Sequence, residues 1–335
     1  MKRWNRKLEL FLRETEWLST LNCVIKSDFS LYPQGTINDS WKIVLRNQFH
    51  DIIPGSSIRE VYEDSEIEYQ EAYRLVKESW VKSANALVKK ENRSLTIFNS
   101  SSWVRDDVVE IAASGGMMKE EGIWIDIDGN PLEAQKTQTG WLVEVPNLPS
   151  LGYANILFVK SCMKSKTNSP FVINEKCIET PYYFISWNEF GQLERIYDKV
   201  AEREVLADGE KGNVFQVFED KPLNFENWDI DIYYQEKMKE VKDLKKVKVL
   251  EHGNLRARIE FSWEYGHSKI VQVMIVYKNN RRIDFQTRVD WREQQQLLKV
   301  AFPVNIRATE ATYDIQFGNV KRPTHWNTSW DLAKF

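Results

Sequence analysis

The chain passes from one predicted helix to a longer one at residues 47–58, which read NQFHDIIPGSSI. The first helical pattern ends at His50 and Asp51, and Pro54-Gly55 directly afterwards requires a sharp bend of the backbone. An imidazole beside a carboxylate offers a metal-type ligand next to a hydrogen-bonding group. A single histidine at the end of a helix is more often a cap or a packed residue, so the pair alone is a modest signal.

Helical patterns flank this turn on both sides. Two helices are predicted before it, and the second begins at Ile37 with Thr36 as its N-cap. After the turn, Ser57 and Glu60 have the spacing of a capping box at the start of a third, longer helix. The predicted inner faces of the first two helices are Leu8, Phe11, Thr15, Leu18, Asn22 and Ile25, and Ile37, Trp41, Val44, Leu45 and Gln48. Short connections between such helices predict an antiparallel three-helix bundle over residues 1–91.

Strand patterns replace the helical ones beyond Ser94. Short segments punctuated by turn residues predict a small β-sandwich domain over 92–165, and longer segments predict a large antiparallel β-sandwich over 166–335. In the larger domain, a hairpin turn is predicted at residues 188–191, and strands are predicted at 182–187, 192–197, 255–261, 270–277 and 282–289. The predicted fold class is therefore α+β multidomain, with the last sandwich incomplete at the C-terminus.

Composition and charge argue against several kinds of partner. The net charge of −3 gives no electrostatic reason to expect nucleic acid or an anionic membrane, and no apolar run approaches a membrane span. Six lysines in residues 237–248 lie among acidic residues, which indicates a solvated hairpin edge rather than a polyanion site. Cys23, Cys162 and Cys177 are too few and too scattered for a disulfide framework, so we predict a cytoplasmic protein.

One long motif carries a family resemblance. Residues 41–58, WKIVLRNQFHDIIPGSSI, closely resemble the glycoside hydrolase family 38 α-mannosidases, in particular their bacterial and cytosolic branch. Further segments similar to the same branch follow in order at 212–215 (GNVF), 218–222 (FEDKP), 228–231 (WDID) and 317–331 (FGNVKRPTHWNTSWD). The resemblance thus spans both the helical and the β portions of the chain.

The resemblance implies a retaining α-mannosidase that releases terminal α-linked mannose with the help of a divalent metal, usually zinc. In this family an N-terminal α/β barrel precedes the bundle, and no alternating βα pattern occurs here, so we expect a middle-to-C-terminal fragment. The nucleophile, the acid/base carboxylate and three of the four metal ligands would lie on that barrel, so no catalytic residue is assigned. The resemblance implies that His50 is a metal ligand and that Asp51 accepts hydrogen bonds from sugar hydroxyls.

We therefore expect the fragment itself to be inactive and to bind zinc weakly or not at all. Its expected partners are α-mannoside glycans and its own barrel domain, and exposed apolar faces leave self-association as a homo-oligomer open. Two alternatives are a non-catalytic carbohydrate-binding or interaction module, and a structural β protein whose aromatic residues all pack in cores. Several residues fit a packed turn or sheet edge as well as a sugar-facing position: Trp228, Asp229, Asp231, Arg322 and His325.

Overall fold

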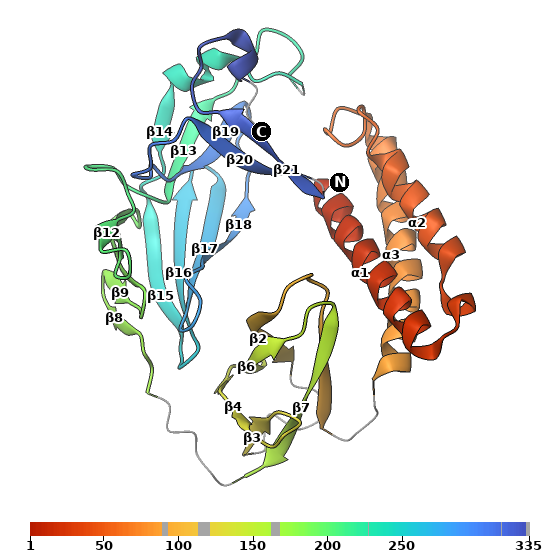
Figure 1. Cartoon of the computed structure of the whole chain (residues 1–335). Coiled ribbons are helices and arrows are strands. Elements are labelled where there is room, and N and C mark those ends of the chain that lie inside the picture. Colours follow the sequence, from red (N-terminus) through yellow and green to blue (C-terminus); the bar gives the residue numbers. More distant parts are fainter. Residues whose placement is uncertain (89–92, 113–120, 162–167, 227, 316, 333–335) are drawn as a thin grey trace. The chain divides into compact units, whose positions relative to one another are not determined.

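A computed structural model describes residues 1–88, 93–112, 121–161, 168–226, 228–315 and 317–332. The chain separates into two compact units. Unit 1 comprises residues 1–169, 220–236 and 253–256, and unit 2 comprises 170–219, 237–252 and 257–335. Long helices come first and antiparallel strands follow (Figure 1), which confirms the α+β class. The predicted domain borders at 91/92 and 165/166 fall outside the described residues, and the division into three domains stays a prediction.

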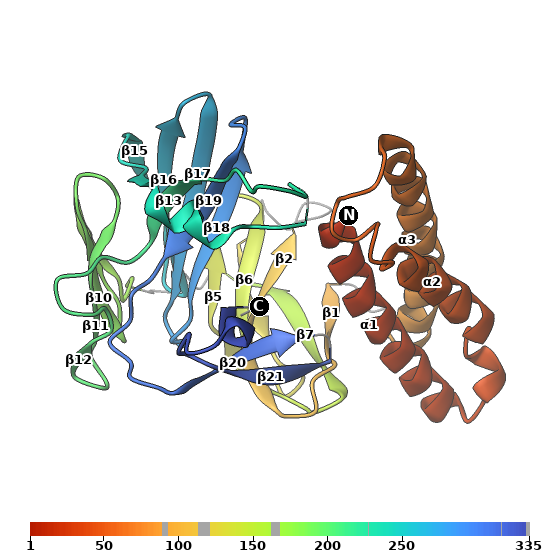
Figure 2. The ribbon, with the colours of Figure 1, turned by 90° about the horizontal axis from the view of Figure 1, so that it is seen from above.

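The bundle of unit 1 consists of α1 (Lys2–Lys26), α2 (Gln34–Asn47) and α3 (Arg59–Leu87), with the short 3-10 helix η1 (Phe29–Leu31) between the first two. The three long helices lie side by side (Figure 2). Their shared core consists of Leu8, Leu12, Ile37, Val44, Tyr69, Ala72 and Val76. Two residues predicted to face inward are exposed instead, Ile25 in the last turn of α1 and Leu45 in α2. Leu45 follows Val44 by one position, about 100° around the helix, and so points away from the core.

Two helix starts differ from the prediction. Helix α2 begins at Gln34 rather than Ile37, and Pro33 is its N-cap in place of Thr36. The N–H group of a residue at the start of a helix has no partner within the helix, so proline, which has no N–H group, loses no hydrogen bond there. Its restricted φ also favours the start of a helix. Helix α3 begins at Arg59 without a side-chain cap, and the backbone N–H of Ser57 donates to the Tyr62 hydroxyl at 2.7 Å in place of the predicted capping box.

The strands of unit 1 form two antiparallel sheets around one core. One sheet has the order β1 (Ser94–Asn99), β7 (Gly152–Lys160), β3 (Gly122–Ile125), β4 (Pro131–Leu132). The other has the order β2 (Arg105–Ala112), β6 (Gly140–Leu148), β5 (Ala134–Lys136). Both contribute to a buried cluster of Ile111, Trp124, Val143, Val145, Leu148, Ile156 and Phe158. Two sheets with their apolar faces together are the arrangement of a small β-sandwich.

Unit 2 is built from antiparallel sheets. The first has the order β12 (Arg203–Glu204), β11 (Leu193–Asp198), β10 (Tyr183–Trp187), β9 (Cys177–Glu179), β8 (Val172–Asn174). The second is a meander, β15 (Leu244–His252), β16 (Arg256–Tyr265), β17 (Ser268–Tyr277), β18 (Ile283–Asp290). The remaining strands are β14 (Met238–Glu240), β13 (Val214–Glu219) and β19 (Gln296–Ala301), and the hairpin β20 (Glu310–Ile315) and β21 (Gly318–Pro323). The lysines of 237–248 are exposed, as predicted, but β14 and β15 are edge strands of two different sheets rather than the two strands of one hairpin.

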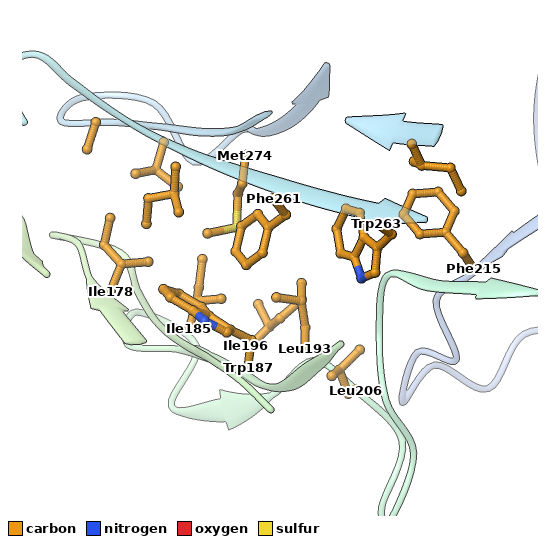
Figure 3. Packing of buried hydrophobic residues seen from close by; sticks show 14 of the residues in the cluster. Ile178, Ile185, Trp187, Leu193, Ile196, Leu206, Phe215, Phe261, Trp263 and Met274 are labelled. Carbon is orange, nitrogen blue, oxygen red and sulfur yellow. The ribbon is translucent and has the colours of Figure 1, made fainter. Parts of the chain in front are cut away.

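Aromatic side chains fill the core of unit 2. Trp263 is 1% exposed, stacks on Phe261 with ring centroids 5.8 Å apart and meets Phe215 edge-on at 5.1 Å (Figure 3). Its indole Nε1 donates to the carbonyl oxygen of Phe190 at 2.7 Å, which fastens the predicted hairpin turn to the core. Gly191 closes that turn with φ +76°, a conformation that favours glycine.

Candidate functional site

The loop of residues 48–58, which joins α2 to α3, is a series of tight turns. Ile52 donates its N–H to the carbonyl of Phe49 at 2.8 Å, and Gly55 donates to the carbonyl of Ile52 at 3.2 Å. Gly55 has φ +103°, so Pro54-Gly55 forms the bend that the sequence predicts. Although the loop has no regular secondary structure, these consecutive backbone hydrogen bonds restrict its conformation.

His50 and Asp51 project from this loop into solvent. Their side chains are 71% and 51% exposed, and His50 Nε2 lies 3.3 Å from Asp51 Oδ2. The imidazole ring also packs against Phe49, with ring centroids 4.2 Å apart. An accessible imidazole next to an accessible carboxylate can bind a cation or hydrogen-bond a polar ligand. The arrangement argues against the reading of His50 as a packed core residue.

A complete metal site is not formed within the described ranges, where no three His, Cys, Asp or Glu side chains come together in a suitable group. An imidazole nitrogen suits a divalent ion, so His50 fits as a single ligand that needs others to complete the coordination sphere. Histidines elsewhere have local partners: His252 Nε2 lies 2.9 Å from the carbonyl oxygen of Phe171, and His325 Nδ1 lies 3.3 Å from Asp331 Oδ2.

A buried polar network lies at the start of the loop. Glu9 of α1 is only 2% exposed, and its Oε1 accepts hydrogen bonds from Gln48 Nε2 at 2.8 Å and Asn5 Nδ2 at 3.1 Å. Gln48 Nε2 also donates to Asn5 Oδ1 at 3.1 Å. Burial, together with the nearby carboxylates of Glu9 and Glu68, raises the pKa of Tyr69 to about 12, so this tyrosine stays protonated at neutral pH.

Tyr62 holds the far end of the loop. Its hydroxyl accepts the N–H of Ser57 at 2.7 Å and donates to the carbonyl of Ile52 at 3.4 Å. An open depression lies beside this contact, lined by Ser57, Arg59, Tyr62, Glu63 and Glu66. The sequence patterns gave no role to Glu9, and they placed Tyr62 on the inner face of the third helix without predicting its hydrogen bonds to the loop. The available signal was the four-residue spacing of Asn5 and Glu9, which places two polar side chains on one face of α1.

The other residues with open roles fall in two local structures. In the segment 220–236, Trp228 is 52% exposed, and Asp231 accepts the N–H of Leu223 at 2.8 Å. The Trp228 ring is therefore not packed in a core, whereas Asp231 holds a turn. Asp229 donates its N–H to the carbonyl of Phe225 at 2.9 Å in the same segment.

Near the C-terminal end, Asp331 Oδ2 accepts the N–H of Thr328 at 2.9 Å as well as approaching His325, so these residues organise a local turn. Arg322 lies on β21, where its backbone pairs with Ala311 of β20. Its position on a strand of a two-stranded hairpin agrees with a role in bracing that hairpin.

Two solved structures share this fold. An α-mannosidase from Enterococcus faecalis matches with a TM-score of 0.77 over 98% of this chain and 45% of its own, at 15% identity. A glycosyl hydrolase family 38 protein from the same organism matches with a TM-score of 0.76 over 96% of this chain and 47% of its own, also at 15% identity. At 15% identity these likenesses show the fold, which is that of part of each of these two proteins.

Sequence comparisons identify the family. Residues 1–87 match the alpha mannosidase middle domain, and residues 178–335 match the glycosyl hydrolases family 38 C-terminal domain. Human alpha-mannosidase 2C1 is 30% identical over 344 residues, which covers 100% of this chain and 31% of the human protein. Alpha-mannosidase G from Dictyostelium discoideum is 30% identical over 378 residues, 34% of its length, and an alpha-mannosidase from Saccharomyces cerevisiae is 28% identical over 345 residues, 28% of its length. The chain belongs to glycoside hydrolase family 38, and it spans about a third of the length of these relatives.

Proposed function

We propose that this chain is part of a retaining α-mannosidase that hydrolyses terminal α-D-mannosyl residues. The observation that carries the proposal is the match of the whole chain, bundle and sandwiches in order, to relatives named alpha-mannosidases. The exposed pair of His50 and Asp51, on a loop held at both ends, supplies the groups that such a site needs from this portion.

In this proposal the two exposed side chains have different tasks. An imidazole nitrogen of His50 coordinates a divalent metal, for which we propose zinc. Residues of an N-terminal barrel domain complete the metal site. Such an ion binds sugar oxygens and stabilises developing charge when it is present. Asp51 accepts hydrogen bonds from the sugar hydroxyls and so orients the ring. Retention of configuration requires two further carboxylates about 5 Å apart, which we assign to the barrel.

The proposed partners are the barrel domain and α-mannoside glycans. We propose a cytoplasmic location, because Cys23 is a buried free thiol and Cys177 is a partly buried one, which suits a reducing compartment. Among the described helices, none is long and apolar enough to cross a membrane. Exposed apolar side chains on the bundle, Phe49, Ile58 and Ile67, suit contact with a further domain or with a second copy.

The test uses the natural full-length protein with an aryl α-mannoside as substrate. His50→Ala should reduce kcat/KM by at least about a hundredfold and weaken reactivation by zinc after chelation, and Asp51→Asn should raise KM. His267→Ala, at an exposed histidine in unit 2, is the matched control and should keep full activity. Absence of α-mannosidase activity in the full-length wild type would contradict the proposal, as would full activity in the His50 variant.

A second candidate is a carbohydrate-binding module, which exposed indole rings favour. Trp228, Trp326 and Trp330 are 52%, 53% and 89% exposed, and sugars stack on accessible aromatic faces. Glycan-array binding by the purified chain that is abolished in Trp330→Ala, combined with an inactive full-length protein, would favour the module.

A further inference from the structure

We propose that Glu9 is a positioning residue for His50, acting through Gln48 at the start of the loop. The inference deepens the proposed function and rests on it where it concerns metal binding. Glu9 lies on α1, whereas His50 follows the end of α2. Glu9 therefore acts on His50 through Gln48, to which it is hydrogen-bonded.

The burial of Glu9 sets the first part of the argument. A carboxylate that is 2% exposed requires hydrogen bonds, because an unpaired buried charge is strongly unfavourable. Oε1 meets this need with Gln48 at 2.8 Å and Asn5 at 3.1 Å, and Oε2 lies 3.4 Å from Arg6 NH1. Apolar residues could pack two helices together equally well, whereas a fully bonded polar group also fixes their register.

Gln48 transmits this register to the loop. It is the C-cap of α2, its backbone N–H donates to the carbonyl of Val44 at 3.1 Å, and it precedes His50 by two residues. Its side chain is tied to Glu9 and Asn5 of α1, so both its backbone and its amide are fixed. The Tyr62 hydroxyl holds the other end of the loop at 2.7 Å from Ser57 N.

His50 depends on the position of its loop, because its side chain contacts Phe49 and Asp51, which are exposed themselves. Its side chain is 71% exposed, so core packing does not fix its position, and the backbone of the loop must do so. A displacement of about 1 Å in a group that helps to bind a metal or substrate can reduce activity about a hundredfold. Loss of the Glu9–Gln48 hydrogen bond should therefore loosen the loop and weaken a site that includes His50.

The experiment compares three variants in the natural full-length protein. Glu9→Leu removes the acceptor at similar size, whereas Glu9→Gln keeps one side-chain oxygen that can accept both hydrogen bonds. The control is Ser19→Ala, which removes a buried hydrogen bond to Ser83 Oγ (3.0 Å) about 15 Å farther along α1. Two properties are measured: deuterium uptake of peptides that cover residues 48–58, by mass spectrometry, and the zinc dissociation constant, by competition with a chelating dye.

We expect Glu9→Leu to speed exchange in residues 48–58 about tenfold and to weaken zinc binding about tenfold, as other outer-sphere substitutions do. Glu9→Gln should restore both values to within about threefold of wild type. Ser19→Ala should leave the exchange in residues 48–58 and the zinc dissociation constant near their wild-type values, even if it lowers the global stability as much as Glu9→Leu does. Should Glu9→Leu not fold, Gln48→Met removes the same hydrogen bond from the loop side and takes its place.

Equal behaviour of the Glu9→Leu and Ser19→Ala variants in both measurements would overturn the inference. Failure of the proposed function has a separate signature, which is a wild-type protein without α-mannosidase activity or His50-dependent zinc binding. In that case the exchange data alone decide whether Glu9 positions the loop: faster exchange only in the Glu9→Leu variant supports that role, and unchanged exchange refutes it.

Discussion

Replacing Gly191 with alanine should destabilise unit 2 through two separate effects. Gly191 has φ +76°, and a left-handed conformation costs a residue with a Cβ about 1–2 kcal/mol. The added Cβ would also lie 2.7 Å from Trp263 Cζ2 and 3.1 Å from Leu244 Cδ1. Trp263 cannot readily move, because it is 1% exposed and its Nε1 is bonded to the Phe190 carbonyl. Overpacking of this kind costs about 1–3 kcal/mol, so we expect a total loss of about 2–5 kcal/mol.

Gly209→Ala is the matched control, because Gly209 has φ +72° and a Cβ added there would have no atom within 4 Å. It should show the backbone cost alone, about 1–2 kcal/mol. Urea unfolding of the full chain, monitored by tryptophan fluorescence, gives the free energy of unfolding of each variant. The losses of stability follow from the shifts in the urea midpoint, provided that the slope against urea concentration is unchanged. If Gly191→Ala lost no more stability than Gly209→Ala, the argument that Trp263 is rigidly placed against the hairpin turn would be refuted.

Two further predictions concern stability. Gly35→Ala should stabilise the bundle by about 0.5 kcal/mol in thermal unfolding followed by circular dichroism, because Gly35 is helical and a Cβ there meets no atom; a lower melting temperature would contradict this. Hydrogen bonds from the N–H groups of Ala201 and Val200, and from Arg281, hold the pKa of Asp198 below its usual 3.8. Its stabilising contribution is therefore present above pH 3.8 and lost as pH falls through the lower folded pKa. Asp198→Asn should destabilise at about pH 7, and its difference from wild type should shrink in strong acid; a constant difference would contradict this.

Periodic patterns were sufficient to predict the three long helices and several of the longer strands. Residues such as Leu8 and Val44 recur at helical spacing because one face of each helix must be buried, and this spacing survives in the sequence. The helix starts were harder to predict. Ser57 has the correct spacing for a capping box, yet the Tyr62 hydroxyl takes its N–H, a competition between partners that spacing alone does not reveal.

The turn that carries the candidate site was predictable from the sequence, whereas the residues that support this turn were not. The motif around His50 identified an imidazole and a carboxylate beside a sharp turn, and the structure places both in solvent. The role that we propose for Glu9 could not be predicted from the sequence, because a glutamate in a helix usually faces water. Its partner Gln48 lies 39 positions away, so the pairing depends on how α1 and α2 pack together.

The order of strands in the meander also determines how the chain can fold. Strands β15, β16, β17 and β18 pair with their neighbours in sequence, so each pairing closes only a short loop and can form soon after synthesis. Strand β13 is made earlier and pairs on one side with β14, which comes before the meander. Its partner on the other side, β19, follows the whole meander, with Glu219 opposite Gln296. One edge of β13 therefore stays unpaired until a late strand is made, and this edge of an apolar strand needs protection while the chain is being made.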